Sequence, residues 1–269
     1  MNIVILGCGE VGGRAGALLV ALGHQVLGVR RRPLAHGRDA FTVVSGDASD
    51  PTLYIAVASA MPRVDAVVLC ANPGLRRGRD NGLDAAATLV HGAFPDCRLI
   101  YTGSTAVYAD AQSGSADEGA AVAADDAAVA GLLRIERAVA QHASALVLRA
   151  TALVGPTRLH ALDRLREAAR LGQACVVRGD LERPFSYLHE QDLAEVCAEA
   201  AVGVLGTGVL NAASPHRLTV GDYYRTLAAR AGIPCTLHGD GTPAPRRWID
   251  AGRLHALLPG RRWRTVDEG

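Results

Sequence analysis

The sequence of 269 residues contains no lysine, and all 28 of its basic residues are arginines. This absence excludes mechanisms that need a lysine amine, such as a Schiff base, a Walker-type phosphate lysine or a lysine-assisted tyrosine acid. With 27 acidic residues, the formal net charge is +1. That balance gives no electrostatic reason to expect nucleic acid or an anionic membrane as a partner.

Signals of membrane insertion, secretion and metal binding are also lacking. No apolar run reaches the roughly 18 residues that a membrane span needs. The start, Met1–Leu6, has no basic region and leads into a glycine motif, so we interpret it as a strand and not a signal peptide. Six cysteines occur without Cys-x-x-Cys spacing, and nine histidines form no His-x-x-x-His pair. We therefore expect a reduced, cytoplasmic protein without disulfides or a metal, acting on a small-molecule substrate.

The first 155 residues alternate short apolar runs with helical patterns such as Val11–Leu22. This alternation predicts an α/β fold with a Rossmann-type, doubly wound parallel sheet over residues 1–155. Residues 156–269 are expected to form a small C-terminal substrate-binding subdomain, with segments of the two parts open to interleaving. The runs predicted as strands are rich in Val, Ile and Leu, as is typical of strands covered on both faces: Asn2–Leu6, Gln25–Arg30, Thr42–Ser45, Ala66–Cys70, Leu99–Thr102 and Leu146–Ala150.

A glycine motif, Gly-x-Gly-x-x-Gly, directly follows the first predicted strand and opens an amphipathic helix. Gly7 permits a tight turn, Gly9 lets a pyrophosphate approach the backbone, and Gly12 lets the helix pack on the sheet. The amino end of the helix would face the phosphates. The motif therefore predicts a dinucleotide site whose contacts include Gly7, Gly9, Glu10, Val11 and Gly12.

The end of the second predicted strand indicates which dinucleotide is bound. NAD proteins usually place an acid there, whereas this chain has Val29-Arg30-Arg31-Arg32. Arg30 and Arg31 offer the planar, permanently charged donors that suit a 2′-phosphate, so we predict NADP(H); the alternative interpretation is an ordinary basic surface loop. Asp47 is interpreted either as a contact to the adenine end or as a turn residue. Ala71, after the fourth predicted strand, is also predicted to contact the cofactor.

Several segments, in this order, resemble the extended short-chain dehydrogenases/reductases, the NAD-dependent epimerase/dehydratase family. The resemblance covers nearly the whole chain and implies a Rossmann domain with a small substrate domain. For the oligomeric state, the resemblance is compatible with a homodimer. The segments are Gly7–Gly12, Ser104–Tyr108, Leu148–Pro156, Tyr187–Ala194, Leu210–Ala212 and Arg247–Asp250.

The resemblance implies that Ser104 is the catalytic Ser/Thr, with Thr105 beside it; the alternative interpretation of Ser104 is a polar residue at the end of a strand. Tyr108 is interpreted either as a proton donor or as a packing residue beside the pocket. The dehydratase subgroup places an acidic pair after its catalytic Thr, but here Ala106 and Val107 follow. The segment Asp110–Asp126 is interpreted as a loop that covers a site or as a plain surface loop.

The sequence departs from the family at its Tyr-x-x-x-Lys pair. If Glu136 matches the family's Glu on the predicted helix Ala127–Gln141, then Ala128 and Leu132 occupy the Tyr and Lys positions. The pair is absent in any register, because the chain has no Lys and no Tyr between Tyr108 and Tyr187. General acid–base help of this kind contributes about 10²–10⁴ in rate, so the usual redox route is disfavoured.

Several charged residues outside the glycine motif are also candidate site residues, and all but Arg134 have two interpretations. Arg134 is predicted to contact the cofactor ribose or phosphate, although its pKa is too high for moving protons. His189 is interpreted as a structural brace or as an acid–base group. Arg149, Arg178 and Arg183 are interpreted as ligands for an anionic substrate group or as members of salt bridges.

Three functions follow from the sequence. The first is an atypical NADP-dependent reductase of a small carbonyl, imine or enone, for which an iminium acceptor would need the least help from an acid. The second is a non-redox epimerase or isomerase of a nucleotide sugar or related metabolite. The third is a binding protein that senses NADP(H) or pairs with another enzyme.

Overall fold

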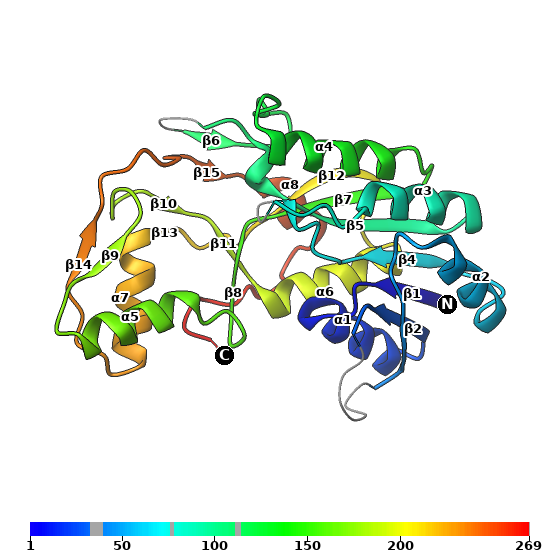
Figure 1. The fold of residues 1–269 in the computed structure, drawn as a ribbon, viewed down its shortest axis with the longest axis horizontal. Helices are drawn as coiled ribbons and strands as arrows, with labels where there is room; N and C mark the ends of the chain where they lie inside the picture. Colours follow the sequence, from blue (N-terminus) through cyan, green and yellow to red (C-terminus); the bar gives the residue numbers. More distant parts are fainter. Residues whose placement is uncertain (33–39, 76–77, 111–113, 269) are drawn as a thin grey trace. The chain divides into compact units, whose positions relative to one another are not determined.

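The computed structural model describes residues 1–32, 40–75, 78–110 and 114–268 (Figure 1). The chain divides into two compact units that interleave along the sequence. A single cut at residue 155 therefore does not describe the division. Unit 1 comprises Met1–Val107, Val122–Arg149 and Leu193–Leu210; unit 2 comprises Tyr108–Ala121, Ala150–Asp192 and Asn211–Gly269.

A seven-stranded sheet forms the framework of unit 1. Neighbouring strands around its centre pair in parallel, with Leu6 opposite both Val29 and Leu69. Parallel neighbours cannot be joined by a short hairpin and need crossover connections, usually helices. The arrangement therefore confirms the predicted doubly wound parallel sheet. In sheet order the strands are β12 (Gly208–Ala212), β7 (Ala145–Ala150), β5 (Arg98–Ser104), β4 (Ala66–Leu69), β1 (Asn2–Leu6), β2 (Gln25–Arg30) and β3 (Thr42–Ser45).

Helices cover both faces of this sheet, with α3 and α4 on one side and α1 and α6 on the other (Figure 1). On the first side, Val90 of α3 and Ile135 of α4 are fully buried and share one core cluster with Val67 and Leu99 of the sheet. Asp50 and Asp126 accept hydrogen bonds from backbone N–H groups at the starts of α2 and α4. The helices are α1 (Glu10–Ala21), α2 (Pro51–Ala60), α3 (Leu83–Ala93), α4 (Ala127–Ala140) and α6 (Glu190–Ala201).

Unit 2 consists of short strand pairs around its own core, in which Phe185 stacks on Tyr223 with ring centroids 4.4 Å apart. The pairs β6–β15, β8–β11 and β9–β14 are parallel, whereas β10–β13 is antiparallel. Their bounds are β6 (Ser115–Ala116), β8 (Ala152–Val154), β9 (Cys175–Val177), β10 (Pro184–Phe185), β11 (Tyr187–His189), β13 (Leu218–Thr219), β14 (Leu237–Gly239) and β15 (Trp248–Ile249). The helices are α5 (His160–Arg170), α7 (Val220–Arg230) and α8 (Gly252–Leu257). Among the described residues, no helix has the length and apolar character needed to cross a membrane.

Candidate functional site

The segment Gly7–Gly12, which we call the glycine elbow, joins β1 to α1. Gly7 has φ +93°, a conformation that favours glycine. A Cβ built on Gly7 would lie 2.4 Å from the backbone N of Ala71. The segment that follows β4 therefore packs directly against the glycine elbow. A Cβ on Gly12 would lie 2.7 Å from the Gly7 carbonyl oxygen. Close packing therefore requires glycine at both positions.

At Gly9 the packing of the protein itself does not require glycine. Its φ is −95°, which any residue can adopt, and among the described residues apart from its chain neighbours a Cβ built on it would meet only the Gly7 carbonyl oxygen, at 4.0 Å. Gly9 is the N-cap of α1 and offers no side chain to the free N–H groups of the first turn. Open space beside unsatisfied N–H groups at the positive end of a helix suits a phosphate. The residues present therefore fit a dinucleotide diphosphate.

Glu10 and Val11 form the first turn of α1. Glu10 is exposed, and its carboxylate lies 3.7 Å from the Arg14 guanidinium, one turn later in the helix. Val11 is half-buried. The structure thus brings the predicted Gly7, Gly9, Glu10, Val11, Gly12 and Ala71 together at the carboxyl end of β1.

The predicted basic residues lie at the carboxyl end of β2, next to β1 in the sheet. Arg30 is half-buried, and its carbonyl accepts a hydrogen bond from the Gly46 N–H at the end of β3. Arg31 is exposed, and its Nη1 donates to Asn81 Oδ1 over 3.2 Å. Sequence reasoning missed Asn81, because no motif marks a loop residue that holds an arginine fifty positions away.

Asp47, after β3, belongs to the same edge of the sheet. Its Oδ1 accepts from the Ser49 backbone N at 3.0 Å and from the Ser49 hydroxyl at 2.8 Å. These hydrogen bonds, together with the charge of Arg31, hold the pKa of Asp47 below its ordinary value. The structure supports the turn interpretation, while the exposed side chain stays available to a ligand.

Ser104 ends β5, and Thr105 begins the 3-10 turn Thr105–Val107. The Ser104 Oγ accepts a hydrogen bond from the Ala106 N–H at 3.2 Å. Within the described part of the chain, its own hydroxyl proton has no acceptor. Ser104 is half-buried, so it can donate this proton to a group bound at the end of β5.

Tyr108 lies in unit 2, where its side chain is buried at 2% exposure. Its hydroxyl donates to Asn211 Oδ1 over 2.6 Å. Asn211 is itself fully buried, and its Nδ2 donates to the carbonyls of Ala116 and Asp250. This network favours the packing interpretation of Tyr108, because the hydroxyl proton is already used inside unit 2.

The positions matched to the family's Tyr-Lys pair lie on α4. Ala128 is half-buried and Leu132 is buried. One turn farther, Glu136 forms a bidentate ion pair with Arg149 of β7, over 3.0 Å and 2.7 Å. The sequence leaves Arg149 open between an anion ligand and a member of a salt bridge. In the structure it forms the salt bridge, with 8% of its side chain exposed.

Arg134, predicted to contact the cofactor, forms two ion pairs in the structure. Its Nε donates to Asp84 over 2.7 Å and its Nη2 to Asp80 over 2.5 Å, so it ties α4 to the start of α3. These carboxylates raise the pKa of Arg134 further. The sequence shows that an arginine is present but not which carboxylates the fold brings to it, so these ion pairs could not be predicted.

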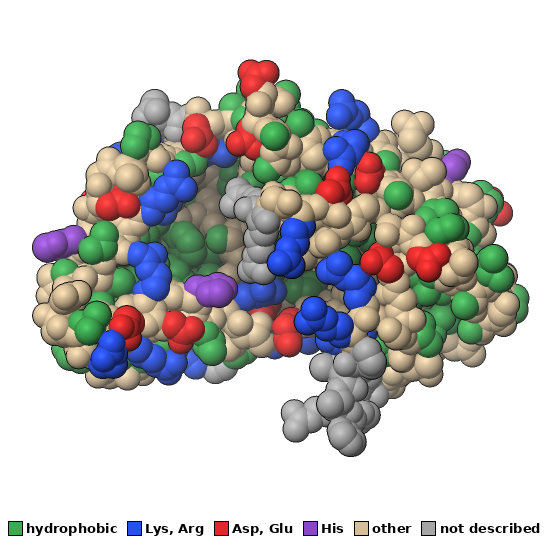
Figure 2. All heavy atoms as spheres, viewed as in Figure 1, with side chains coloured by type: hydrophobic (Ala, Val, Ile, Leu, Met, Phe, Trp, Pro, Cys, Tyr) green, Lys and Arg blue, Asp and Glu red, His purple; other side chains and the backbone are tan. Residues whose placement is uncertain are grey.

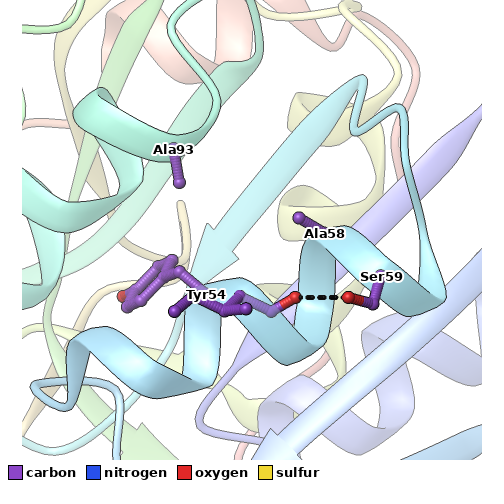
Figure 3. A pocket seen from close by; sticks show the side chains of 5 residues that line it. Tyr54, Ala58, Ser59 and Ala93 are labelled. Atoms are coloured by element: carbon purple, nitrogen blue, oxygen red, sulfur yellow. Dashed lines mark hydrogen bonds between the residues drawn. The ribbon is translucent and has the colours of Figure 1, made fainter.

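A separate surface depression lies between α2 and α3 (Figure 3). Its lining is mostly apolar and comprises Tyr54, Ile55, Ala58, Ser59 and Ala93. The Ser59 hydroxyl donates to the Ile55 carbonyl of its own helix and not to the depression (Figure 3). None of the predicted site residues lines it. Among the described residues, no group of three or more His, Cys, Asp or Glu side chains could hold a metal ion.

Known proteins resemble this chain in sequence profile and in fold. The profile of the NAD dependent epimerase/dehydratase family matches residues 3–211. No curated protein matches the sequence. Among solved structures, dTDP-glucose 4,6-dehydratase from Bacillus anthracis in complex with NAD is 16% identical, with a TM-score of 0.81 over 100% of this chain and 94% of that chain.

Two further solved structures are similar. UDP-glucuronic acid 4-epimerase from Bacillus cereus in complex with NAD is 14% identical, with a TM-score of 0.78 over 99% of this chain and 95% of that chain. The Bordetella bronchiseptica enzyme WbmH in complex with NAD⁺ is 18% identical, with a TM-score of 0.79 over 99% and 94%. At these identities the likeness establishes the shared fold.

Proposed function

Because the chain belongs to the NAD dependent epimerase/dehydratase family, we propose that its glycine elbow binds a nicotinamide dinucleotide and that this dinucleotide is NADP(H). We further propose that the protein is a reductase of a small carbonyl, imine or enone metabolite. The observation that carries the proposal is the open space beside Gly9 at the amino end of α1. Titration of the protein with NADPH, followed by the fluorescence of the nicotinamide, tests it directly.

The preference for NADP(H) rests on Arg30 and Arg31. In a Rossmann fold, the residue ending the second strand faces the adenosine ribose, and an acid there accepts hydrogen bonds from its hydroxyls. An arginine offers donors instead, which suit a 2′-phosphate. Asn81 supports this arrangement by holding the Arg31 guanidinium at the same edge of the sheet.

Arg30→Asp is expected to weaken NADPH binding at least tenfold while NADH binding changes little or improves. A charge-assisted hydrogen bond contributes about 1.5–3 kcal/mol, and the new carboxylate would also repel the 2′-phosphate. The measurement is the pair of dissociation constants from fluorescence titration. Arg137→Asp, the same charge reversal at an exposed position on α4, should leave both constants unchanged. An equal loss for NADPH and NADH in Arg30→Asp would show that Arg30 does not select the cofactor.

When bound, the reduced nicotinamide supplies a hydride to the acceptor carbon. The residues of the chain must then orient the acceptor and provide a proton where the product needs one. Ser104 is suited to orient a carbonyl, because its hydroxyl proton has no other acceptor among the described residues. With Tyr and Lys missing from α4, the proton comes from water, or none is needed, as for an iminium acceptor.

Ser104→Ala is expected to lower kcat/KM at least tenfold, with the NADPH dissociation constant unchanged. The lost hydroxyl would otherwise donate to the developing charge on the acceptor oxygen, which is a part of general acid catalysis. Stopped-flow oxidation of bound NADPH across ketones, imines and enones provides the rate. Tyr108→Phe is the comparison: it breaks the bond to Asn211 and should lower stability, with little effect on turnover. A tenfold loss in Tyr108→Phe with full activity in Ser104→Ala would reverse these assignments.

A second candidate is a protein that binds NADP(H) without turnover and reports its concentration to a partner. The observation in its favour is that Ala128 and buried Leu132 occupy the acid–base positions of α4, while the Tyr108 proton is held by Asn211. Tight NADPH binding without oxidation by any acceptor in the panel would favour this candidate. Dehydration, the activity named for one of the similar structures, is less well supported, because Ala106 and Val107 follow Thr105 where the dehydratase subgroup has an acidic pair.

A further inference from the structure

Asn81, in the loop before α3, joins the segments that follow β2, β3 and β4 in unit 1. Its Oδ1 accepts a hydrogen bond from the Arg31 Nη1, just after β2, over 3.2 Å. Its Nδ2 donates to the Asn72 carbonyl, after β4, over 2.7 Å. The next residue, Gly82, has φ +64°, and a Cβ built on it would lie 2.9 Å from the Ser49 Cβ, after β3. Asn81 therefore lies where the carboxyl ends of these strands meet.

The chemistry of its partners fixes the orientation of the Asn81 amide. The Arg31 guanidinium can only donate hydrogen bonds, and the Asn72 carbonyl can only accept them. A flipped amide would set donor against donor and acceptor against acceptor, so one orientation alone satisfies both partners. The backbone N–H of Asn81 also donates to the Pro73 carbonyl, over 3.1 Å. The arginine is thus held by an oxygen whose direction is fixed.

The loop that carries Asn81 is closely packed on its other side. Gly74 has φ +79°, and a Cβ built on it would lie 2.9 Å from the Asn81 Nδ2. The Gly74 N–H donates to the Asn72 Oδ1 over 2.8 Å. Asn72 directly follows Ala71, which packs against Gly7 of the glycine elbow. The Asn81 amide is therefore tied to the backbone that borders the proposed diphosphate site.

Arg31 gains a fixed position from this contact. Its side chain is exposed, and its carbonyl accepts a hydrogen bond from the Ser45 hydroxyl over 3.3 Å. Asp47 attracts the Arg31 guanidinium through its charge, while its own hydrogen bonds go to Ser49. A long exposed side chain loses rotamer freedom when it binds a ligand, which lowers affinity. The bond to Asn81 orders the guanidinium beforehand and uses only one of its N–H donors.

Charge alone does not make this part of the molecule selective. In Figure 2, basic side chains gather in the part of the view where Figure 1 places α1, and all are arginines because the chain has no lysine. Such a field favours any anion. A guanidinium in a fixed position recognises a phosphate by geometry as well as by charge. Selectivity for a 2′-phosphate therefore depends on what holds the arginine in place.

We propose that Asn81 is a positioning residue for cofactor selectivity, which holds Arg31 toward the 2′-phosphate of NADP(H) without touching the cofactor. The inference rests on the proposed binding of NADP(H) at the glycine elbow. It assigns the selectivity to a pair of residues in which the asparagine acts through the arginine. Substitutions of Arg31 and Asn81 should therefore be strongly non-additive.

The test compares the ratio of the NADH to the NADPH dissociation constant between variants, from fluorescence titration. Arg31→Ala is expected to lower this ratio at least tenfold, because a charge-assisted hydrogen bond is lost. Asn81→Ala should lower it about 2- to 10-fold, the effect of leaving one long side chain unordered. Asn81→Leu, which lacks the amide but has a similar volume, should do the same. In the Arg31→Ala background, Asn81→Ala should change the ratio no further.

Asn72→Ala is the matched control, because it alters the same loop but keeps the carbonyl that Asn81 binds. A purely structural change weakens both cofactors alike, so this variant should keep the wild-type ratio. The proposal is overturned if Arg31→Ala or both Asn81 variants keep that ratio, or if Asn81→Ala lowers it equally without Arg31. In these cases a wild-type preference for NADPH would still support the proposed cofactor. A wild type without that preference would overturn both proposals.

Discussion

Gly9→Ala is expected to abolish tight NADPH binding while the protein stays folded. The backbone of Gly9, at φ −95° and ψ −152°, accepts an alanine, and the added Cβ would find its nearest protein atom 4.0 Å away. That same space is where the diphosphate would approach the start of α1. Forcing a methyl group into a packed contact costs about 1–3 kcal/mol, so affinity should fall roughly 10- to 100-fold. Fluorescence titration gives the affinity, and thermal unfolding gives the stability.

Neighbouring glycines provide matched controls for this prediction. Outside α1 itself, a Cβ on Gly13 would meet no atom of the described residues within 4 Å, so Gly13→Ala should keep full affinity and should stabilise α1 by about 0.5–1 kcal/mol. Gly7→Ala should instead destabilise the fold, because φ is +93° and Ala71 blocks the Cβ. Unchanged NADPH affinity in Gly9→Ala would show that no diphosphate rests on the glycine elbow.

The strands and the glycine elbow could be predicted because their signals are local. The predicted bounds of Asn2–Leu6, Gln25–Arg30 and Thr42–Ser45 match β1, β2 and β3, since each is an apolar run ended by a polar or glycine residue. A central parallel strand is buried on both faces, so its composition alone identifies it. The strand β5 runs from Arg98 to Ser104, one residue before and two residues beyond the predicted Leu99–Thr102.

The partners of charged and polar side chains could not be predicted in the same way. The sequence predicts a cofactor contact for Arg134 and leaves Arg149 open between an anion ligand and a salt bridge. The fold brings Asp80 and Asp84 to Arg134 and Glu136 to Arg149. These contacts join residues that lie on different elements. The Tyr108–Asn211 bond spans 103 positions, and no periodicity in a sequence encodes such a distance. Sequence reasoning therefore proposes the glycine elbow as the site but cannot say which charged side chains the fold pairs with one another.

Arg149→Met is expected to cause the largest loss of stability among the variants considered. The two hydrogen bonds to Glu136 join side chains that are 8% and 9% exposed. Methionine fills a similar volume but leaves the Glu136 carboxylate buried without its cation. Removing one partner of a buried pair costs about 3–5 kcal/mol, whereas typical domains have only about 5–15 kcal/mol of stability. Urea unfolding followed by circular dichroism should show a midpoint far below that of wild type.

The double variant Arg149→Met/Glu136→Leu separates two contributions to stability: the stabilisation by the ion pair, and the cost of leaving the Glu136 carboxylate buried without a cation. If the loss in Arg149→Met comes from the buried carboxylate, then removing that carboxylate should restore most of the midpoint, since apolar pairs often replace buried ion pairs without loss. Arg170→Met, which breaks the exposed pair with Glu167, should leave the midpoint unchanged. A double variant no more stable than Arg149→Met would mean that the ion pair itself holds β7 to α4.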